Sequence, residues 1–321
     1  MKTKIIFGLL TCLMFGGCAK DDDVIPSYKD QDWFRIEDDP NDALTHLRYT
    51  IYMEEGVPIF YNDTLGSEIR YNKAGEAYTY YEILKLGYAI TGVSSALKYA
   101  LADDLTDVMA MTELMDKYLF DYLPKGKRPL SYLLVDSAIL KTGSQGGYTV
   151  YDDYYKAMTS TCVGNIEKVK EMTENEKKSF AAELAGLEFV DDVVSAAELT
   201  GDLVAAYDSL SLKVKLDLTT YAPIQVGNSG YGAVISGNRS RQLPESELFG
   251  LIHYRHAEGY SLFIPTKEQD KAAYIGMILS LTDEEIREKY KDYPVVLEKY
   301  GLIRKMLVRV GIIEDEPDNR E

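Results

Sequence analysis

The residues best suited to carry chemistry are the histidines, of which the chain has three. Two of them, His253 and His256, lie three positions apart, so on a helix both rings would share one face and hold a zinc ion. Glu245, Glu247 or Glu258 would add a carboxylate ligand. The flanking residues also alternate as in a strand, which directs the two rings to opposite faces. Two hypotheses stay open, a divergent zinc site and a pair of surface histidines, and we favour the second.

Other catalytic arrangements have less support. The sequence contains neither a Gly-x-Ser-x-Gly motif nor a phosphate-binding loop. A glycosidase-like carboxylate pair stays open, but the adjacent acids Asp103-Asp104 and Asp152-Asp153 better fit a helix start and a solvated turn. The loop Gly227–Gly232 is flexible enough to approach a ligand, as many loops are. Cys162 has no adjacent basic residue to stabilise a thiolate, so we expect a small buried residue rather than a nucleophile.

Hydrophobic periodicity predicts the elements that must position these residues. We expect helices at 42–52, 103–120, 173–194, 196–209, 269–281, 282–290 and 294–310, and strands at 59–61, 67–71 and 130–135. Asn41 would cap the first helix, and Thr173 with Glu176 and Thr282 with Glu285 form capping boxes. The pattern is typical of an α+β protein, mainly helical with a few short strands, in a single domain over residues 41–313. We expect the acidic tail 314–321 to be disordered.

The amino-terminal residues have the pattern of an export signal. Lys2 and Lys4 precede the apolar run Ile5–Phe15, which is too short to cross a bilayer, and two glycines lead into Cys18. This ending resembles the lipobox of bacterial lipoproteins. The resemblance implies that residues 1–17 are removed and that the Cys18 thiol is acylated, which anchors the chain to the lipid bilayer of the outer membrane. A secretory signal with a chance cysteine is the alternative.

The segment after Cys18 indicates the destination of the anchored protein. Residues 18–40 are acidic and contain prolines, as expected of a tether. Ala19 differs from the aspartate that retains lipoproteins in the inner membrane. The run Lys20–Asp23 resembles the tag that sends lipoproteins to the exterior of the cell. We therefore expect display on the cell surface, with a plain solvated spacer as the alternative.

Composition limits the partners and the covalent chemistry. Removing residues 1–17 deletes two lysines and no acidic residue, which changes the formal net charge from -17 to -19. A chain this acidic repels nucleic acid, so no nucleic-acid partner is expected. After processing and acylation Cys162 has no cysteine to pair with, so no intrachain disulfide is expected. The chain has 26 tyrosines, with clusters at 78–81 and 151–155, where we expect packing in the core or at sheet edges.

The order of these elements resembles that of a known family, the zinc-metallohydrolase lipoproteins encoded beside TonB-dependent nutrient importers. The shared pieces are the lipoprotein signal, a helix before a strand (LRYTIYMEEGVPIFYND), a helix running into an apolar strand (DKYLFDYLPKGKRPLSYLLVDS), a central helix and a C-terminal helical pair (LTDEEIREKYKDYPVVLEKYGLIRKMLVRVGI). The resemblance implies a zincin-like, metallopeptidase-related fold and a place beside a TonB-dependent importer complex.

The zinc motif of that family is not intact in this chain. In the family the central helix carries His-Glu-x-x-His, whose histidines bind zinc and whose glutamate is the general base. The corresponding helix here reads Ala182-Glu183-Leu184-Ala185-Gly186, which keeps the glutamate and replaces both histidines. The family's third ligand would fall near Lys267–Asp270, where the motif is also altered. The resemblance therefore implies a vestigial Glu183, no zinc at this position and no cofactor.

These observations lead to three functional hypotheses. The favoured one is a surface-exposed outer-membrane lipoprotein that acts without catalysis, as a binding or accessory component of a nutrient-uptake system. The second is a divergent zinc metallohydrolase, peptidase-like, that uses His253, His256 and Glu258 or another nearby carboxylate. The third is an adhesin or assembly scaffold that presents tyrosines on a flat face. Peptide, glycan and partner protein all stay open as the ligand.

Overall fold

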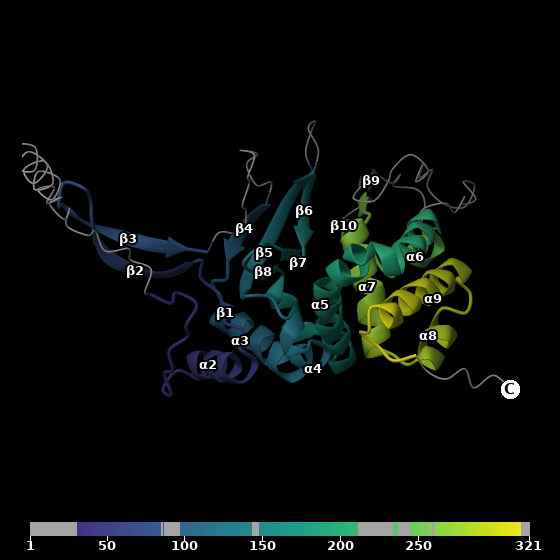
Figure 1. Cartoon of the computed structure of the whole chain (residues 1–321), viewed down its shortest axis with the longest axis horizontal. Coiled ribbons are helices and arrows are strands. Elements are labelled where there is room, and N and C mark those ends of the chain that lie inside the picture. Colours follow the sequence, from purple (N-terminus) through teal and green to yellow (C-terminus); the bar gives the residue numbers. More distant parts are fainter. Residues whose placement is uncertain are drawn as a thin grey trace, which may run out of the picture. The chain divides into compact units, whose positions relative to one another are not determined.

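The chain folds as a mixed α+β protein, as the sequence predicts (Figure 1). The computed structural model describes residues 31–84, 86, 97–142, 148–210, 234–236, 245–254, 256–258 and 261–315. The chain divides into two compact units, one formed by Met1–Trp33 with Glu68–Tyr80 and the other by Phe34–Ser67 with Tyr81–Glu321. Over the described ranges, no helix is both long and apolar enough to span a bilayer.

The helices are α2 (Ala43–Glu55), α3 (Leu105–Leu114), α4 (Phe120–Tyr122), α5 (Glu174–Ser195), α6 (Ala197–Leu210), α7 (Lys267–Ser280), α8 (Asp283–Lys289) and α9 (Pro294–Arg309). A π-helical turn at Met115–Leu119 joins α3 to α4, and 3-10 turns lie at Lys125–Lys127, Ile166–Glu171 and Ser246–Phe249. The strands are β1 (Ile59–Phe60), β2 (Thr64–Tyr71), β3 (Ala77–Ile83), β4 (Leu97–Leu101), β5 (Tyr132–Thr142), β6 (Tyr148–Asp152), β7 (Tyr154–Lys156), β8 (Thr161–Val163), β9 (Val234–Ser236), β10 (His256–Glu258) and β11 (Ser261–Phe263).

Local capping signals set most helix starts. Complete capping boxes begin α5, α7 and α8, and the boxes of α5 and α8 are those that the sequence predicts. Asp104 caps α3, which confirms the helix start predicted at the pair Asp103-Asp104. The cap predicted for the first helix is wrong by one residue. Asp42 accepts the hydrogen bond from the backbone N–H of Thr45, while Asn41 donates to the side chain of Asp39.

Strand β5 combines two pairing patterns within one sheet. Its first residues pair in parallel with β1 and β8, and its remaining length pairs antiparallel with β4 and β6. Residues 132–135 are fully buried, which confirms the buried strand predicted there. Leu130, which the prediction included, lies before the strand and is 67% exposed, so the strand begins at Tyr132.

Two hydrophobic cores lie in the larger unit, on opposite faces of β5. Alternate side chains of the strand enter each core, with Tyr132 and Leu134 in the larger helical core and Leu133 and Val135 in the smaller one. The larger core is built mainly by α3, α5, α7 and α9. The strand is buried on both faces, which explains why it reads in the sequence as a continuous apolar run.

The smaller core also contains Cys162 and Ile36, two residues for which the sequence makes a prediction. Cys162 on β8 is fully buried there, as expected of a small core residue. Ile36 is buried in the same core, and the ring of Phe34 packs edge-on against Phe60 with 5.8 Å between ring centroids. Phe34 and Ile36, which the sequence analysis assigns to the tether 18–40, are therefore packed in or against the smaller core of the larger unit.

The described part of the smaller unit contains the outer half of the β2–β3 hairpin. The guanidinium of Arg70 lies 3.3 Å from the centre of the Tyr80 ring and donates to Glu68. Tyr78 and Tyr81 are exposed on β3, an edge strand of the two-stranded β2–β3 sheet, so of the two predicted placements the cluster at 78–81 takes the sheet edge and not the core. The reason is that a two-stranded hairpin buries little surface on its own.

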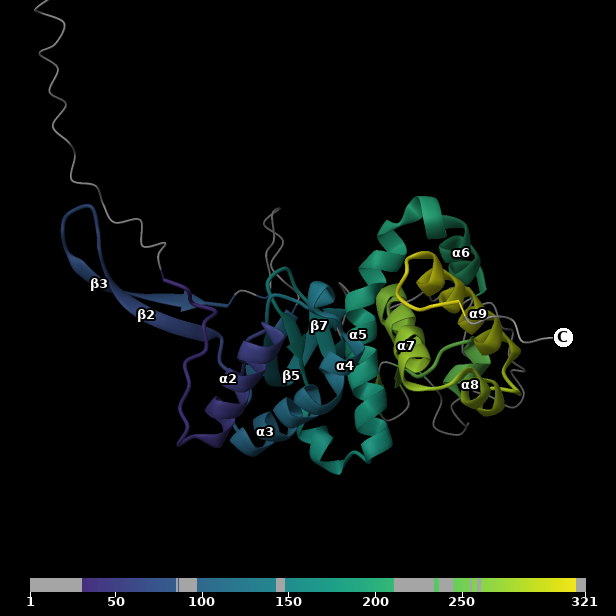
Figure 2. The same cartoon turned by 60° about the horizontal axis from the view of Figure 1, so that its bottom comes forward.

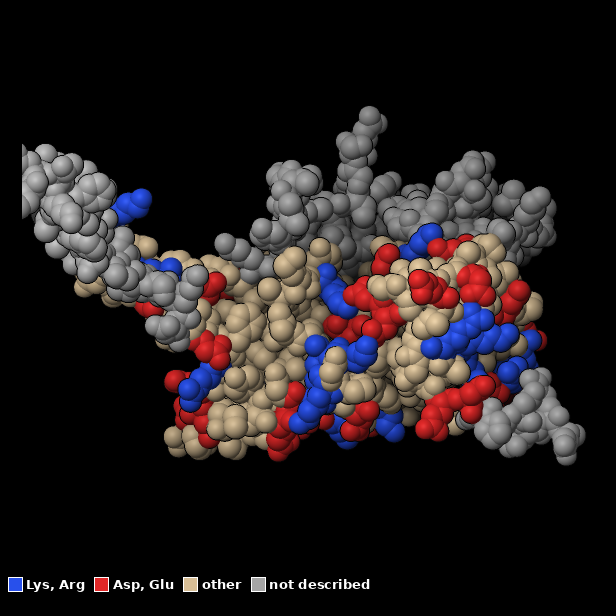
Figure 3. Space-filling model, viewed as in Figure 1, with Lys and Arg blue, Asp and Glu red and all other residues tan. Residues whose placement is uncertain are grey.

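On the face drawn in Figure 3, acidic and basic side chains are interspersed and lie beside wide areas of uncharged residues. Several form exposed ion pairs, among them Lys117 with Glu174 at 2.7 Å and Lys127 with Asp192 at 2.6 Å. Exposed pairs of this kind contribute at most about 1 kcal/mol each, so the cores and not these pairs determine the fold.

Helices α5 and α7 lie side by side and touch through their backbones (Figures 1 and 2). A Cβ atom on Gly186 would lie 2.4 Å from the carbonyl oxygen of Ala272. A Cβ atom on Gly276 would lie 2.6 Å from the Cα atom of Glu183. Because neither distance leaves room for a carbon atom, both positions require glycine, and the contact holds Glu183 against α7.

We expect the substitution Gly186→Ala to lower the free energy of unfolding by about 1–3 kcal/mol, because the new methyl group must push α7 away. Gly201→Ala in α6 is the matched control, since a Cβ there meets nothing within 4 Å and alanine favours a helix. Urea unfolding of both variants measures the difference. Equal stability of Gly186→Ala and the parent protein would contradict the close helix contact.

Candidate functional site

Glu183 and His253 meet in the structure, although seventy positions separate them in the chain. Glu183 lies on α5, and His253 lies in the segment that follows the 3-10 turn Ser246–Phe249. The Nε2 atom of His253 is 3.2 Å from Oε1 of Glu183, and the hydroxyl of Tyr154 donates to the same oxygen at 2.8 Å. The Glu183 side chain is 17% exposed and the His253 side chain 48%. The buried carboxylate therefore has both a cationic and a neutral partner.

The two groups shift each other's titration. The negative charge of Glu183 raises the pKa of His253 to about 9, against the opposing effect of burial. Burial alone would raise the pKa of Glu183, but the charge and hydrogen bond of His253 and the Tyr154 hydroxyl outweigh it and lower that pKa. Near neutral pH the pair is a carboxylate and an imidazolium. The ring of His253 is then already protonated and does not serve as a general base.

A cavity of about 240 Å³ opens beside this pair. It is formed by residues of α5, of the 247–253 segment, of α7 and of the end of α8. Its walls consist of Ser179, Glu183, Glu247, Ile252, His253, Ala273, Met277, Ser280, Leu281, Lys289 and Tyr290. The cavity thus combines two carboxylates, two cationic groups and an aliphatic surface, a composition suited to binding a small molecule.

A tight turn at Gly250 sets the course of the segment that carries Glu247 and His253. Gly250 has φ +71°, in the left-handed region, and a Cβ atom there would lie 2.5 Å from a methyl carbon of Val295. The carbonyl oxygen of Gly250 accepts hydrogen bonds from the hydroxyl of Tyr274 and from Nζ of Lys299. One wall of the cavity is therefore attached to α7 and α9 through a single backbone carbonyl.

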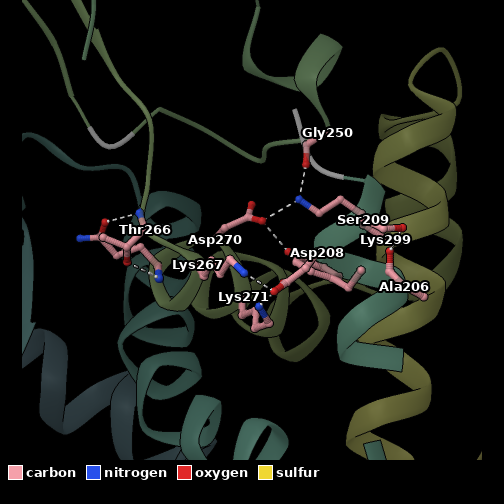
Figure 4. A network of polar contacts seen from close by, with 11 residues as sticks. Ala206, Asp208, Ser209, Gly250, Thr266, Lys267, Asp270, Lys271 and Lys299 are labelled. Carbon is pink, nitrogen blue, oxygen red and sulfur yellow. Dashed lines mark hydrogen bonds and ion pairs between the residues drawn. The ribbon is translucent and has the colours of Figure 1, made fainter. Parts of the chain in front are cut away.

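Lys299 belongs to a buried polar network (Figure 4). Its Nζ atom lies 2.6 Å from the Gly250 oxygen and 2.6 Å from Oδ2 of Asp270, and both side chains are almost completely buried. The rings of Tyr207 and Tyr274 flank the ammonium at 4.4 Å and 4.8 Å. Burial lowers the pKa of Lys299, and Asp270 opposes this shift. Asp270, in the segment Lys267–Asp270 that the sequence analysis compared with a metal-ligand motif, accepts hydrogen bonds from Lys299 of α9 and Tyr207 of α6 through its Oδ2 atom.

The same network extends to the surface of α7 (Figure 4). Asp208 on α6 binds Lys267 at 2.6 Å and Lys271 at 2.7 Å. The two lysines hold the pKa of Asp208 below its usual value, although burial acts in the opposite direction. Charge pairs therefore connect α6, α7 and α9 around the amino-terminal end of α7.

The residues at the predicted motif position do not fit a zinc ion. Ala182 is fully buried, and the place of a side chain at Gly186 is taken by the backbone of α7. Glu183 is engaged by His253 and Tyr154. In the portion of the chain that the structure describes, no group of three or more His, Cys, Asp and Glu side chains is placed to hold a metal ion.

Among the described side chains, His253 is the predicted zinc candidate that the structure brings to Glu183. His253 lies in a segment without helical structure, and His256 and Glu258 lie on β10, whose side chains are not among those described. The helical arrangement of the two histidines, the less favoured of the two hypotheses, therefore does not form. Glu247 lines the cavity, whereas Glu245 accepts a hydrogen bond from Tyr293 at 2.5 Å.

Several other predicted sites have different outcomes. Asp153 accepts hydrogen bonds from Asn165 and Lys168, which fits a structural turn. The side chain of Asp152 is not among those described. Cys18, the loop Gly227–Gly232 and residues 316–321 lie outside the described residues, so these predictions stay as they were.

Sequence reasoning missed the contact between Glu183 and His253. One signal for it was present, because Glu183 interrupts a run of helix residues that are otherwise apolar and a buried carboxylate needs a partner. The sequence did not show which of the distant cations would be that partner. For the same reason, the sequence did not show that Lys299 pairs with Asp270.

Comparison with known proteins adds no relative. No family model matches the chain, and neither a curated protein nor a solved structure matches it. The geometry of the cavity and the sequence patterns therefore carry the functional argument.

We expect Lys299→Met to lower the free energy of unfolding by about 3–5 kcal/mol, because it leaves the buried Asp270 carboxylate without its cation. The control is Lys267→Met, which removes a lysine that is 52% exposed and is expected to change stability by at most about 1 kcal/mol. The double variant Asp270→Asn with Lys299→Met should recover part of the loss. Chemical denaturation of all three variants tests this, and a Lys299→Met protein as stable as the control would contradict it.

The ion pair between Glu183 and His253 should make the free energy of unfolding depend on pH, in a direction that follows from the two pKa shifts. The folded pKa of about 9 lies above the ordinary value near 6.5, so the stabilisation by His253 is complete below about pH 6.5 and is lost as the pH rises through 9. Glu183 has a lowered pKa, so its contribution is lost only in acid. The stability difference between the parent protein and His253→Gln should therefore be larger at pH 6 than at pH 10.

Urea unfolding across this pH range measures that difference. His46→Gln serves as the control, because His46 is a surface histidine paired with Asp38 at 2.7 Å and far along the chain from the cavity. A stability difference for His253→Gln that grows from pH 6 to pH 10 would show that the pair has been assigned the wrong charges.

Proposed function

We propose that this chain is a lipoprotein anchored to the outer membrane through acylated Cys18 and facing the cell exterior, where it acts as a binding component of a nutrient-uptake system. The amino-terminal pattern supports the anchor: two lysines, a short apolar run and two glycines before Cys18. The acidic segment after Cys18 supports the outward orientation. The resemblance in element order supports a partnership with a TonB-dependent importer.

The observation that carries the non-catalytic part of this proposal is the backbone contact between α5 and α7. At Gly186 the carbonyl oxygen of Ala272 takes the space that a zinc-binding side chain would need. The Oε1 oxygen of Glu183 is paired with Nε2 of His253 and accepts the hydrogen bond of the Tyr154 hydroxyl, so the protein itself occupies this oxygen. The cavity beside the pair remains suited to binding a small molecule, which favours recognition over hydrolysis.

We further propose that the α+β fold is related to that of zincin-like metallopeptidases. The order of helices and strands supports this relation. So does the position of α7, which carries the altered third-ligand segment and packs directly on α5. On this proposal the backbone contact between α5 and α7 and the ion pair between Glu183 and His253 have replaced an ancestral metal centre.

Cell fractionation with a fatty-acid label tests the anchor. We expect the full chain, produced in a Gram-negative host, to incorporate the label and to enter the membrane fraction, because acyl chains provide stable anchoring. Cys18→Ser should lose both properties. Cys162→Ser is the control, since that thiol is buried in the core. Label that persists in Cys18→Ser, or a parent protein in the cytosol, would refute the anchor.

Metal analysis of the purified protein at neutral pH tests the non-catalytic assignment. The proposal expects zinc well below one equivalent and no hydrolysis of a mixed peptide library, with or without added zinc. The competing hydrolase hypothesis expects one zinc per chain and a peptidase activity that His253→Gln abolishes. Stoichiometric zinc with such activity would end the non-catalytic assignment.

A further inference from the structure

Two of the four charges around the cavity are available to a ligand. The Glu183 and His253 side chains are directed at each other. Glu247 accepts a hydrogen bond from the hydroxyl of Ser246 and forms no ion pair within the described structure. Lys289 lies over the ring of Tyr290 at 5.1 Å and likewise has no carboxylate within ion-pair distance among the described residues. Counting only described residues, the cavity thus offers one carboxylate, that of Glu247, and one ammonium, that of Lys289, that are not already in an ion pair.

The remaining walls are aliphatic. Ala273 and Met277 of α7 are mostly buried and line the cavity, and Ile252 and Leu281 add further apolar surface. An apolar group placed there would gain the free energy of leaving water, in proportion to the area it buries. The site therefore combines charged groups of opposite sign with a hydrophobic wall.

The volume limits the ligand to a single small unit. A cavity of about 240 Å³ is below the range typical of drug-sized ligands. A hexose would fit by size, but its hydroxyls are neutral and leave both the carboxylate and the ammonium without a charged partner. A peptide longer than two residues exceeds the volume. A zwitterion with one apolar substituent matches the charge, the wall and the size together.

We propose that this cavity binds a free α-amino acid with an apolar side chain, whose ammonium meets Glu247, whose carboxylate meets Lys289 and whose side chain packs on Met277. This inference rests on the proposed binding function and names its ligand class. The hydroxyl of Ser179, at the rim, supplies a neutral donor for the carboxylate. The pair of Glu183 and His253 forms a neutral polar wall behind the ligand.

Isothermal titration calorimetry of the full chain with L-leucine tests the proposal. We expect a Kd of about 1 mM or tighter, which nine non-hydrogen atoms can supply. Leucinamide lacks the carboxylate, N-acetylleucine lacks the ammonium and glycine lacks the side chain. Each should bind at least tenfold more weakly, because each leaves one element of the site unsatisfied.

Variants assign each ligand group to its partner. Glu247→Gln should weaken leucine at least tenfold and leave N-acetylleucine unchanged, and Lys289→Met should weaken leucine at least tenfold and leave leucinamide unchanged. The controls Glu298→Gln and Lys291→Met change exposed charges that do not line the cavity, and both should bind leucine as the parent does. Circular dichroism of each variant verifies that it is folded.

The proposal is overturned if leucine gives no binding at about 10 mM, a concentration far above the expected Kd. It is also overturned if glucose or a leucine dipeptide binds more tightly than leucine, or if the two variants bind leucine like their controls. Any of these results would refute the proposed ligand only. Failure of the broader proposed function appears separately, as zinc-dependent peptide hydrolysis or as loss of the lipid anchor.

Discussion

The contact between the backbones of α5 and α7 is the constraint on which the rest of this structure depends. Gly186 and Gly276 remove the side chains that would keep the helices apart, and the carbonyl of Ala272 fills the space. Helices normally pack with axes 8–10 Å apart, separated by side chains, so a backbone contact fixes their relative position more tightly than usual. Glu183 on one helix and Met277 on the other thereby come to line the same cavity.

A second constraint holds the opposite wall of that cavity. The Gly250 carbonyl is bound by Lys299 and Tyr274, and the charge of Lys299 is balanced by Asp270. Placing an ammonium and a carboxylate in a core gives little net stability, because both lose their hydration. The arrangement instead favours one geometry, since any other position of the 247–253 segment takes the Gly250 carbonyl away from the buried ammonium of Lys299 and leaves that hydrogen bond unmade. The polar core thus determines where His253 lies.

The sequence predicted those parts of the fold that are determined locally. The capping residues of α5 and α8 lie within one helical turn of the groups that they bind, and the apolar run of β5 reflects burial on both faces. Asn41 was chosen as a cap where Asp42 is used, because both side chains suit that role.

The sequence did not predict the candidate site. The partner of Glu183 lies in a distant segment, and periodicity contains no information on which cation meets which carboxylate. The same holds for Lys299 and Asp270. Glu183 lies on the helix that the capping box at Thr173 predicts, but its contacts with His253 and Tyr154 were not predicted.

Strand β5 has a consequence for how this polypeptide acquires its fold. Its early half needs β1 from upstream and β8 from downstream, and its later half needs β4 and β6 in the same way. Such non-local pairing slows folding, because the entropy of closing long loops is lost before the stabilising contacts between strands form. A nascent chain that has emerged only as far as β5 therefore presents an open, apolar strand edge. The sheet is complete only after β8 has been synthesised, and until then this edge of β5 is open to pairing with another chain.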